Sequence, residues 1–411
     1  MPAIPQPNLA SAAFQADPFP FFARLRREAP VFRARLPGRR GGWLVTRYDD
    51  TIAALRDERL LKDPRTATRA GAKEPWAPGF LKPLQKNMLD LDGADHARLR
   101  RLVHRAFTPR RVDEMRERIQ AICDGLLDAM EGRGRVDLMR EYALPLPATI
   151  IAELLGIPTR DMARFHRWSS RLVAVTSARG AITAIPALWR FMRYLRALVE
   201  ERRARPRDDL VSALVQAEDA GDPLSGDELL AMITILLIAG HETTVNLIAS
   251  GTLALLRHPR QLQRLRDDPA LMPSAVEELL RYTSPVSLAT ERYAREPLEI
   301  AGTRVAHGDL VLVALSSANR DERQFAEPDA LDVGRAPNRH LAFGQGIHFC
   351  VGAPLARLEG QIALTTLLRR APGLRLAAPA GSLRWNRGLF LRSLRRLPVA
   401  LQPSLRHASS S

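Results

Sequence analysis

Cysteine is scarce in this chain of 411 residues, which contains only Cys123 and Cys350. Two cysteines cannot supply the disulfide framework of a small secreted domain, so the composition predicts a protein of the reducing cytoplasm. Cys123 lies within an apolar helical pattern, IQAIC over 119–123, and is expected to be a core residue. Cys350 has a different setting and needs a separate explanation.

Long apolar runs and a leader-like start are also missing. The longest apolar stretch covers 231–239, well short of the ~20 residues that cross a bilayer. Residues 1–7 have neither a basic n-region nor an apolar h-region. We therefore expect no signal peptide and no membrane anchor, and we interpret 231–239 as part of a buried helix.

Lysine occurs at only four positions of the 61 that are basic, so 57 (61 − 4) are arginine. The arginines are distributed along the whole chain, which carries a net charge of +16. Because no basic tail, zinc-finger spacing or aromatic-interleaved RNA motif accompanies this charge, it indicates a compositional bias. We expect no nucleic-acid partner, although the charge suits an acidic protein partner.

The length and the 46% content of hydrophobic residues allow a large core. Helical periodicity dominates from about 95 to 282, and strand-like patterns occur at 31–35, 42–46, 298–300 and 310–314. The sequence therefore predicts a mainly α protein with small β-sheets. The two separated strand regions are expected to pair into one small sheet that closes over a helical body.

A glycine-rich loop carries the second cysteine: residues 343–352 read FGQGIHFCVG, and a predicted apolar helix follows. Glycine permits backbone angles that other residues resist, and a helix N-terminus stabilises a thiolate. One buried thiolate in such a loop suits a single axial bond to a haem iron, whereas zinc sites usually recruit several Cys or His. The alternative is a reduced core cysteine beside an ordinary turn.

The longest predicted helix carries a second chemical pattern. It opens at Ser225, with Glu228 placed as in a capping box, and runs to 258–259. Within it, residues 239–244 read AGHETT and interrupt an apolar stretch. Glycine and threonine weaken a helix and make room for a ligand, and a carboxylate beside a hydroxyl can pass protons. The alternative is a polar patch on an exposed helix face.

Together these patterns resemble those of the cytochrome P-450 family. Residues 343–352 match its haem-ligand loop, Phe-x-x-Gly-x-His/Arg-x-Cys-x-Gly, and the match extends over 338–342 and 353–359. The resemblance implies the fold of a soluble bacterial member, with a helical body and a β-rich lobe around a buried haem. It predicts one domain over 1–411, with a β-rich lobe of about 1–60, 285–335 and 375–403 and a helical lobe of about 61–284 and 336–374.

The resemblance assigns roles to the residues of the cysteine loop. It implies that Cys350 is the proximal ligand of the haem iron, that Phe343 lies against the sulfur and tunes its potential, and that His348 bonds a haem propionate. Gly352 completes the loop pattern and is also expected at the cofactor. The other predicted propionate partners match family positions far from the loop in sequence; they are His96, Arg100 and Arg292.

The AGHETT segment resembles the family's distal-helix signature. By this resemblance Glu242 is the acid and Thr243 the alcohol that deliver protons, and Ala239 and Gly240 border the oxygen groove. His241 occupies a variable position and is given no role. A third match, Glu278-x-x-Arg281 with Arg335 before the loop, implies a structural lock behind the haem.

The implied activity is that of a monooxygenase that inserts one oxygen atom of O2 into a lipophilic small molecule. It implies haem b and electrons from NAD(P)H through a separate ferredoxin or flavodoxin, for which Arg100, Arg110, Arg111 and Arg357 are candidate docking residues. We expect a monomer with a mostly apolar pocket built from 76–88, 172–188, 286–290 and 389–390. The alternatives are a peroxide-dependent haem-thiolate peroxygenase and a non-catalytic haem sensor.

Overall fold

The computed structural model describes residues 4–36, 41–67, 87–161, 164, 168, 178–219 and 225–401. The chain divides into two compact units. Unit 1 comprises Met1–Ala72, Arg116–Ala143 and Thr243–Ser411, and unit 2 comprises Lys73–Met115 and Leu144–Glu242.

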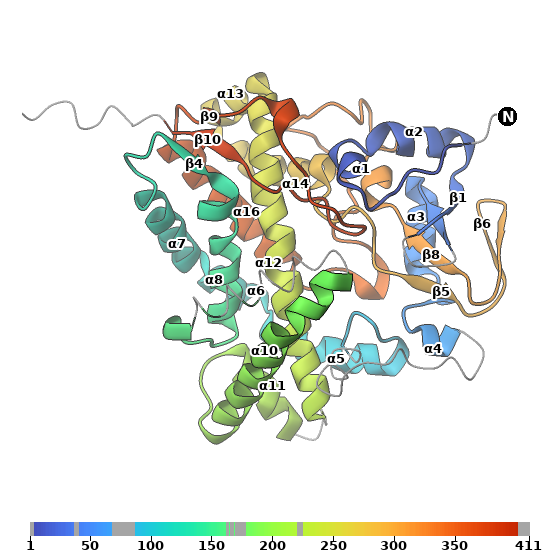
Figure 1. Cartoon of the computed structure of the whole chain (residues 1–411), viewed down its shortest axis with the longest axis horizontal. Helices are drawn as coiled ribbons and strands as arrows, with labels where there is room; N and C mark the ends of the chain where they lie inside the picture. Colours follow the sequence, from blue (N-terminus) through green and yellow to red (C-terminus); the bar gives the residue numbers. More distant parts are fainter. Residues whose placement is uncertain are drawn as a thin grey trace, which may run out of the picture. The chain divides into compact units, whose positions relative to one another are not determined.

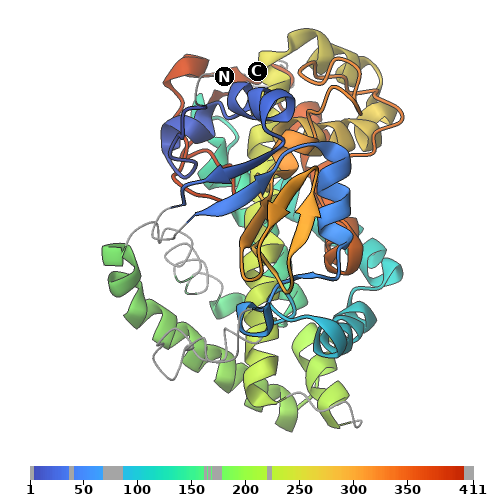
Figure 2. The same cartoon turned by 90° about the vertical axis from the view of Figure 1, so that its right-hand side faces the viewer.

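A five-stranded sheet forms in unit 1 in the order β1-β2-β8-β5-β3. Its strands are β1 (Val31–Ala34), β2 (Gly42–Val45), β8 (Leu310–Val313), β5 (Arg292–Ala294) and β3 (Leu60–Leu61). β2 and β8 are parallel and the other pairs are antiparallel. Figure 2 shows the blue N-terminal strands beside the orange strands from the C-terminal half. This confirms that the predicted strands at 31–35 and 42–46 share one small sheet with the strand predicted at 310–314.

The central strand β8 reads LVLV because both of its faces are covered. Leu310 and Leu312 pack in one apolar cluster with Leu44, whereas Val311 and Val313 belong to the other cluster. A strand that is buried on both faces shows a continuous apolar run in place of an alternating pattern. This double burial places the sheet at the centre of unit 1.

The remaining strands form two smaller sheets in unit 1. One has the order β4-β10-β9, from Arg135–Asp137, Pro398–Ala400 and Arg375–Leu376. The other is a hairpin of β6 (Leu298–Ile300) and β7 (Thr303–Val305). The expectation that 298–300 joins the sheet of 310–314 is wrong, because Ala301 and Gly302 take positive φ and turn β6 back on β7.

Helices make up most of both units. Those of unit 1 are α1 (Ala12–Ala16), α2 (Phe19–Glu28), α3 (Tyr48–Arg56), α4 (Pro64–Ala67), α7 (Arg116–Asp128), α13 (Pro259–Asp267), α14 (Met272–Thr283), α15 (Leu315–Ala318) and α16 (Ala353–Arg370). Those of unit 2 are α5 (Gly93–Ala106), α6 (Pro109–Glu114), α8 (Pro145–Leu154), α10 (Ala178–Ala204) and α11 (Leu210–Asp219).

The longest of these helices, α12, spans Gly226–Arg257, as predicted. Its capping box is present: the Glu228 N–H donates to Ser225 Oγ (3.2 Å) and the Ser225 N–H donates to the Glu228 carboxylate (2.8 Å). By length and composition this helix could cross a membrane, but 67% of its most apolar window is buried, as in the core helix of a soluble protein. The boundary between the two units falls within it, between Glu242 and Thr243.

The C-terminal helix α16 is the centre of the helical part of unit 1. It packs against α7 and α14. In Figure 1, α16 is drawn in red and α7 in teal. Gly360 permits close packing on α12, because a Cβ there would lie 2.9 Å from Leu247 Cδ2. Such packing joins α14, α16 and the second half of α12 to the unit that holds the sheets. The predicted β-rich and helical lobes therefore do not coincide with the two compact units. The expectation of a single domain stays a prediction.

Candidate active site

The shape of the cysteine loop depends on two glycines. Gly344 and Gly346 have φ of 70° and 74°, in the left-handed region that favours glycine. A Cβ on Gly346 would also lie 2.8 Å from the carbonyl oxygen of Leu55 in α3. The loop closes where the Cys350 N–H donates to the Phe343 carbonyl over 3.0 Å. Since α16 begins three residues later, the predicted loop-to-helix arrangement is confirmed.

Gly352 differs from these two glycines. Its φ of −85° is open to any residue, and a Cβ there would meet nothing within 4 Å. The polypeptide therefore does not itself require glycine at this position, and the expected place of Gly352 at the cofactor stays a prediction.

Cys350 is exposed in the polypeptide, and its role as the ligand of a haem iron stays a prediction. Cys123, in contrast, is fully buried in α7, and burial raises the pKa of its thiol to about 12. The exposure of Cys350 follows from its loop, which lies at the surface of the chain with Ile347 58% and Phe349 37% exposed. The two cysteines thus have opposite settings, and only Cys350 can meet a group from outside the polypeptide.

The donor set around Cys350 fits a haem held by one thiolate. Among the described residues, no group of three or more His, Cys, Asp and Glu could hold a metal ion. A single sulfur ligand at a helix N-terminus is the arrangement that a haem iron accepts. The exposed Ile347 and Phe349 supply apolar surface next to the sulfur, as a flat apolar group would require. His348, half-buried between them, is the polar residue of the same turn.

The predicted propionate partners lie in different units. His96 is buried and Arg100 half-buried, and they share one face of α5 in unit 2 at i,i+4 spacing. Arg292 is buried in β5 of unit 1, where its Nη1 donates to the Thr290 carbonyl over 3.2 Å. Each residue is a cation or ring donor of the kind that buried carboxylates need. Their contact with a propionate stays a prediction.

The AGHETT segment lies in the middle of α12. Ala239 is exposed there, and Gly240 is explained by packing, because a Cβ would lie 3.0 Å from the side chain of Ile151 in α8. The His241 Nδ1–H donates to the Leu237 carbonyl over 2.7 Å, in keeping with the absence of an assigned role. Gly240 therefore packs closely against α8, and His241 is bonded to its own helix.

Glu242 and Thr243 follow directly and are both half-buried. Burial raises the pKa of Glu242 to about 7. A carboxyl with this pKa can both hold and release a proton near neutral pH, which is the property that general acid–base chemistry needs. The proton-delivery role predicted for the pair stays a prediction.

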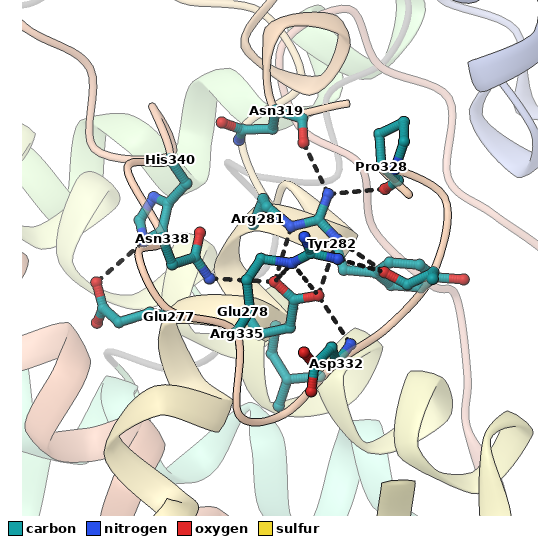
Figure 3. A network of polar contacts seen from close by, with 12 residues as sticks. Glu277, Glu278, Arg281, Tyr282, Asn319, Pro328, Asp332, Arg335, Asn338 and His340 are labelled. Atoms are coloured by element: carbon teal, nitrogen blue, oxygen red, sulfur yellow. Dashed lines mark hydrogen bonds and ion pairs between the residues drawn. The ribbon is translucent and has the colours of Figure 1, made fainter. Parts of the chain in front are cut away.

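The predicted lock between Glu278, Arg281 and Arg335 is confirmed (Figure 3). Glu278 and Arg281 are fully buried in α14 and pair through two hydrogen bonds of 2.7 and 2.8 Å. Arg335 Nε lies 3.2 Å from both Glu278 oxygens, and the Asn338 side chain donates to one of them over 3.1 Å. Arg281 also donates to three main-chain carbonyls, those of Asn319, Pro328 and Ala330. Every charge in the network has a partner, which a buried ion pair requires.

The sequence analysis missed a second carboxylate in α14. Glu277 binds Arg357 of α16 through two hydrogen bonds, Nε–Oε1 at 2.7 Å and Nη2–Oε2 at 2.8 Å, and its Oε2 lies 3.0 Å from Nε2 of His340. Burial alone would raise the pKa of Glu277, but the hydrogen bonds from His340 and Arg357 bring it down to about 2. The only signal in the sequence was the pair of adjacent acids, Glu277 and Glu278.

A third carboxyl, Glu359 of α16, was known only as part of the extended motif. It is 1% exposed, and neither of its oxygens makes a hydrogen bond within the described chain. Burial raises the pKa of Glu359 to about 8, although the nearby Thr244 hydroxyl lowers it in part without reaching hydrogen-bond geometry. Burial therefore favours the protonated form of Glu359.

The predicted docking and pocket residues are only partly described. Three of the four docking arginines have acidic partners within the chain, namely Glu114 for Arg110, Asp208 for Arg111 and Glu277 for Arg357. Most of 76–88 and part of 172–188 lie outside the described residues. Of the other pocket segments, the Ser287 N–H donates to the Phe390 carbonyl over 2.7 Å, so 286–290 and 389–390 do lie together.

Comparisons with known proteins agree on one family. The sequence pattern described as Cytochrome P450 matches residues 187–371. The polyketide biosynthesis cytochrome P450 PksS of Bacillus subtilis is 43% identical over 94% of this chain and 96% of its own length, and its structure superposes with a TM-score of 0.90 over 97% of this chain and 100% of that one.

Two further relatives are similar over nearly their whole length. The cytochrome P450 monooxygenase PikC of Streptomyces venezuelae is 47% identical over 94% of this chain and 91% of its own length. The myxobacterial cytochrome P450 CYP267B1, solved in complex with myristic acid, has a TM-score of 0.90 and 43% identity over 96% of this chain and 99% of that one.

The matches confirm the predicted fold, a mainly α protein with small β-sheets. By sequence and by fold the chain belongs to the cytochrome P450 family, and it is an oxygen-incorporating oxidoreductase that uses haem b, O2 and electrons from NAD(P)H through redox partners.

Proposed function

We propose that this cytochrome P450 hydroxylates or epoxidises a lipophilic substrate of the polyketide or fatty-acyl type, with Cys350 as the ligand of the haem iron. The observation that carries the proposal is the exposed residue Cys350 at the end of the glycine loop, three residues before α16 begins. The substrate class is supported by two relatives, one named for polyketide biosynthesis and one bound to myristic acid. The haem supplies the redox centre at which dioxygen is activated.

The residues of this chain would supply the proton and the binding site. Glu242, with its pKa near 7, takes up a proton from the surrounding water, and the adjacent Thr243 hydroxyl hands it inward. His96, Arg100, Arg292 and His348 neutralise the two propionates, and Phe343 and Gly352 belong to the loop around the sulfur. Ala239 and Gly240 border the space that the oxygen occupies.

Electrons would come from a ferredoxin or a flavodoxin, because members of this family take them from redox partners. The net charge of +16 favours an acidic donor. We place the enzyme in the cytoplasm as a monomer. A reduction rate that falls steeply with added salt would support an acidic donor, and a rate indifferent to ionic strength would contradict it.

The direct test is an absorbance titration of the purified ferric protein with polyketide macrolactones, long-chain fatty acids, terpenoids and steroids. A low-spin-to-high-spin Soret shift with the first two groups supports the substrate class. A shift with steroids or terpenoids alone would contradict that class but keep the thiolate haem. A protein that shows no thiolate-type haem spectrum after reconstitution would overturn the assignment of Cys350.

The proton route has its own test. Thr243→Ala should consume NADPH but release much of the reducing power as peroxide, so that product per NADPH falls severalfold. Thr252→Ala is the matched control, because Thr252 lies in the same helix and its hydroxyl donates to the Ile248 carbonyl over 2.7 Å. If Thr243→Ala still forms product in a one-to-one ratio with NADPH, the route is wrong.

A further inference from the structure

The ring of Phe343 is held by a cation. The guanidinium carbon of Arg357 lies 4.5 Å from the centroid of this ring, within the range of a cation–π contact. Arg357 comes from α16, seven residues after Cys350, whereas Phe343 begins the loop that ends at Cys350. The contact therefore joins the two ends of the cysteine segment through side chains.

Glu277 fixes the orientation of this cation. It binds Arg357 with both carboxylate oxygens, at 2.7 and 2.8 Å, in the fork-to-fork geometry that allows one guanidinium plane. The pair is about one-third exposed, with side-chain exposures of 35% for Arg357 and 26% for Glu277, so its geometry contributes more than its Coulomb energy.

His340 connects the same carboxylate to the backbone next to Phe343. Its Nδ1 accepts the Ala342 N–H over 3.2 Å, and its Nε2–H donates to the Glu277 carboxylate over 3.0 Å. The His340 ring also lies 5.9 Å from the Phe343 ring, centroid to centroid. Figure 3 shows this His340–Glu277 contact beside the lock formed by Glu278.

Phe343 in turn contacts the cysteine end of the loop. Its carbonyl accepts the Cys350 N–H over 3.0 Å, and its ring lies 6.4 Å from the ring of Phe349. The ring of Phe343 therefore has Arg357, His340 and Phe349 as neighbours, and Phe349 is the residue before Cys350.

We propose that Glu277, Arg357 and His340 form a clamp that positions the Phe343 ring beside Cys350 and so sets the reduction potential of the thiolate site. This inference rests on the proposed function, since it takes Cys350 as the haem ligand. Arg357 and Glu277 are positioning residues, because they act on the sulfur through Phe343. The clamp also contains a charge pair, the Arg357 guanidinium and the Glu277 carboxylate.

The charge pair predicts opposite effects for its two halves. Arg357→Gln leaves the Glu277 carboxylate uncompensated beside the loop, so the site should accept an electron less readily and its potential should become more negative. Glu277→Gln leaves the guanidinium uncompensated, and the potential should become more positive. The double variant restores the charge balance and should shift the potential less than either single variant.

The position of the ring is measured separately. The holoenzyme is labelled with 4-fluorophenylalanine in place of Phe343. The fluorine resonance should shift and broaden in Arg357→Gln. Arg357→Lys should shift it part of the way, because lysine keeps the charge but loses the planar fork. Arg24→Gln is the matched control: Arg24 pairs with Glu28 at 2.8 Å, with similar side-chain exposures of 31% and 35%.

The outcomes separate this inference from the proposed function. A wild-type protein without a thiolate-type spectrum overturns the proposed function. A wild-type protein with that spectrum, but with potential and fluorine signal the same in Arg357→Gln as in Arg24→Gln, overturns the clamp alone. If Arg357→Gln does not fold, the fluorine signals of the charge-conserving variants Arg357→Lys and Glu277→Asp take its place, and a signal unchanged in both would likewise overturn the clamp.

Discussion

Glu278 and Glu359 are both fully buried in unit 1, with 0% and 1% of their surface exposed, yet they have opposite surroundings. Glu278 accepts hydrogen bonds from Arg281, Arg335, Asn338 and the Asp332 main chain. Glu359 accepts none from the described residues, and burial raises the pKa of Glu359 to about 8. Burial alone therefore does not decide whether a carboxyl is charged; the donors around it decide.

The largest effect should come from removing the paired carboxylate. Glu278→Gln leaves the buried Arg281 guanidinium without its counter-ion, and the loss of one member of a buried pair costs about 3–5 kcal/mol. Chemical unfolding of the purified variant, or its failure to accumulate as folded haem protein, measures this loss. Glu28→Gln, which breaks the partly exposed pair with Arg24, should cost under about 1 kcal/mol. Equal stability of the two variants would contradict the comparison.

The unpaired carboxyl should behave in the opposite way. Since its folded pKa lies above the unfolded value, Glu359 binds its proton more tightly in the folded state, so it lowers the stability as pH rises from about 4.5 to about 8. Glu359→Gln should remove this loss and be about 2–4 kcal/mol more stable than the wild type at pH 8. Unfolding midpoints from pH 5 to pH 9 measure the difference. An unchanged pH dependence would show that Glu359 has a partner.

Glu242 tests, on the proposed proton route, whether the surroundings of a carboxyl decide its charge. Burial raises its pKa to about 7, so the carboxyl loses its proton as pH rises through that value. If it is the acid that supplies protons, coupled product formation should fall about tenfold per pH unit above its pKa. Glu242→Gln should lose this dependence along with most of the coupled activity. A wild-type profile that stays flat from pH 6 to pH 9 would remove Glu242 from the proton route.

The smallest effect is expected at Glu228, a carboxylate with partial burial and good partners. Burial would raise its pKa, but the Ser225 N–H and Arg98, 2.6 Å away, outweigh burial and lower it. Its stabilisation is therefore present above the unfolded pKa and lost as pH falls, the reverse of Glu359. Glu228→Ala should cost about 1 kcal/mol at pH 7 and less near pH 4, as seen in thermal unfolding. An equal cost at both pH values would contradict the charge-based explanation.

The sequence predicts those parts of the site that depend on neighbours within one or two turns. Gly344 and Gly346 are set by local backbone angles, and the Glu278–Arg281 pair spans a single helical turn. These features follow from short-range geometry, so the motif alone was sufficient to predict them.

Other parts depend on residues that are distant in sequence. The partners of Glu277 lie 63 and 80 residues further along the chain, and Gly240 is explained only by Ile151 of another helix. Long-range packing decides these cases, and a single sequence does not contain it.

The two adjacent glutamates of α14 have a consequence for how such an enzyme can change over evolutionary time. Glu278 faces Arg281 and Arg335, whereas Glu277 faces His340 and Arg357, and the two sets share no side chain. Substitutions among the partners of Glu277 can therefore change the reduction potential proposed for the Cys350 site. The buried network of Glu278, Arg281 and Arg335 stays intact. Two consecutive residues of α14 therefore differ in how far their partners can be replaced during evolution.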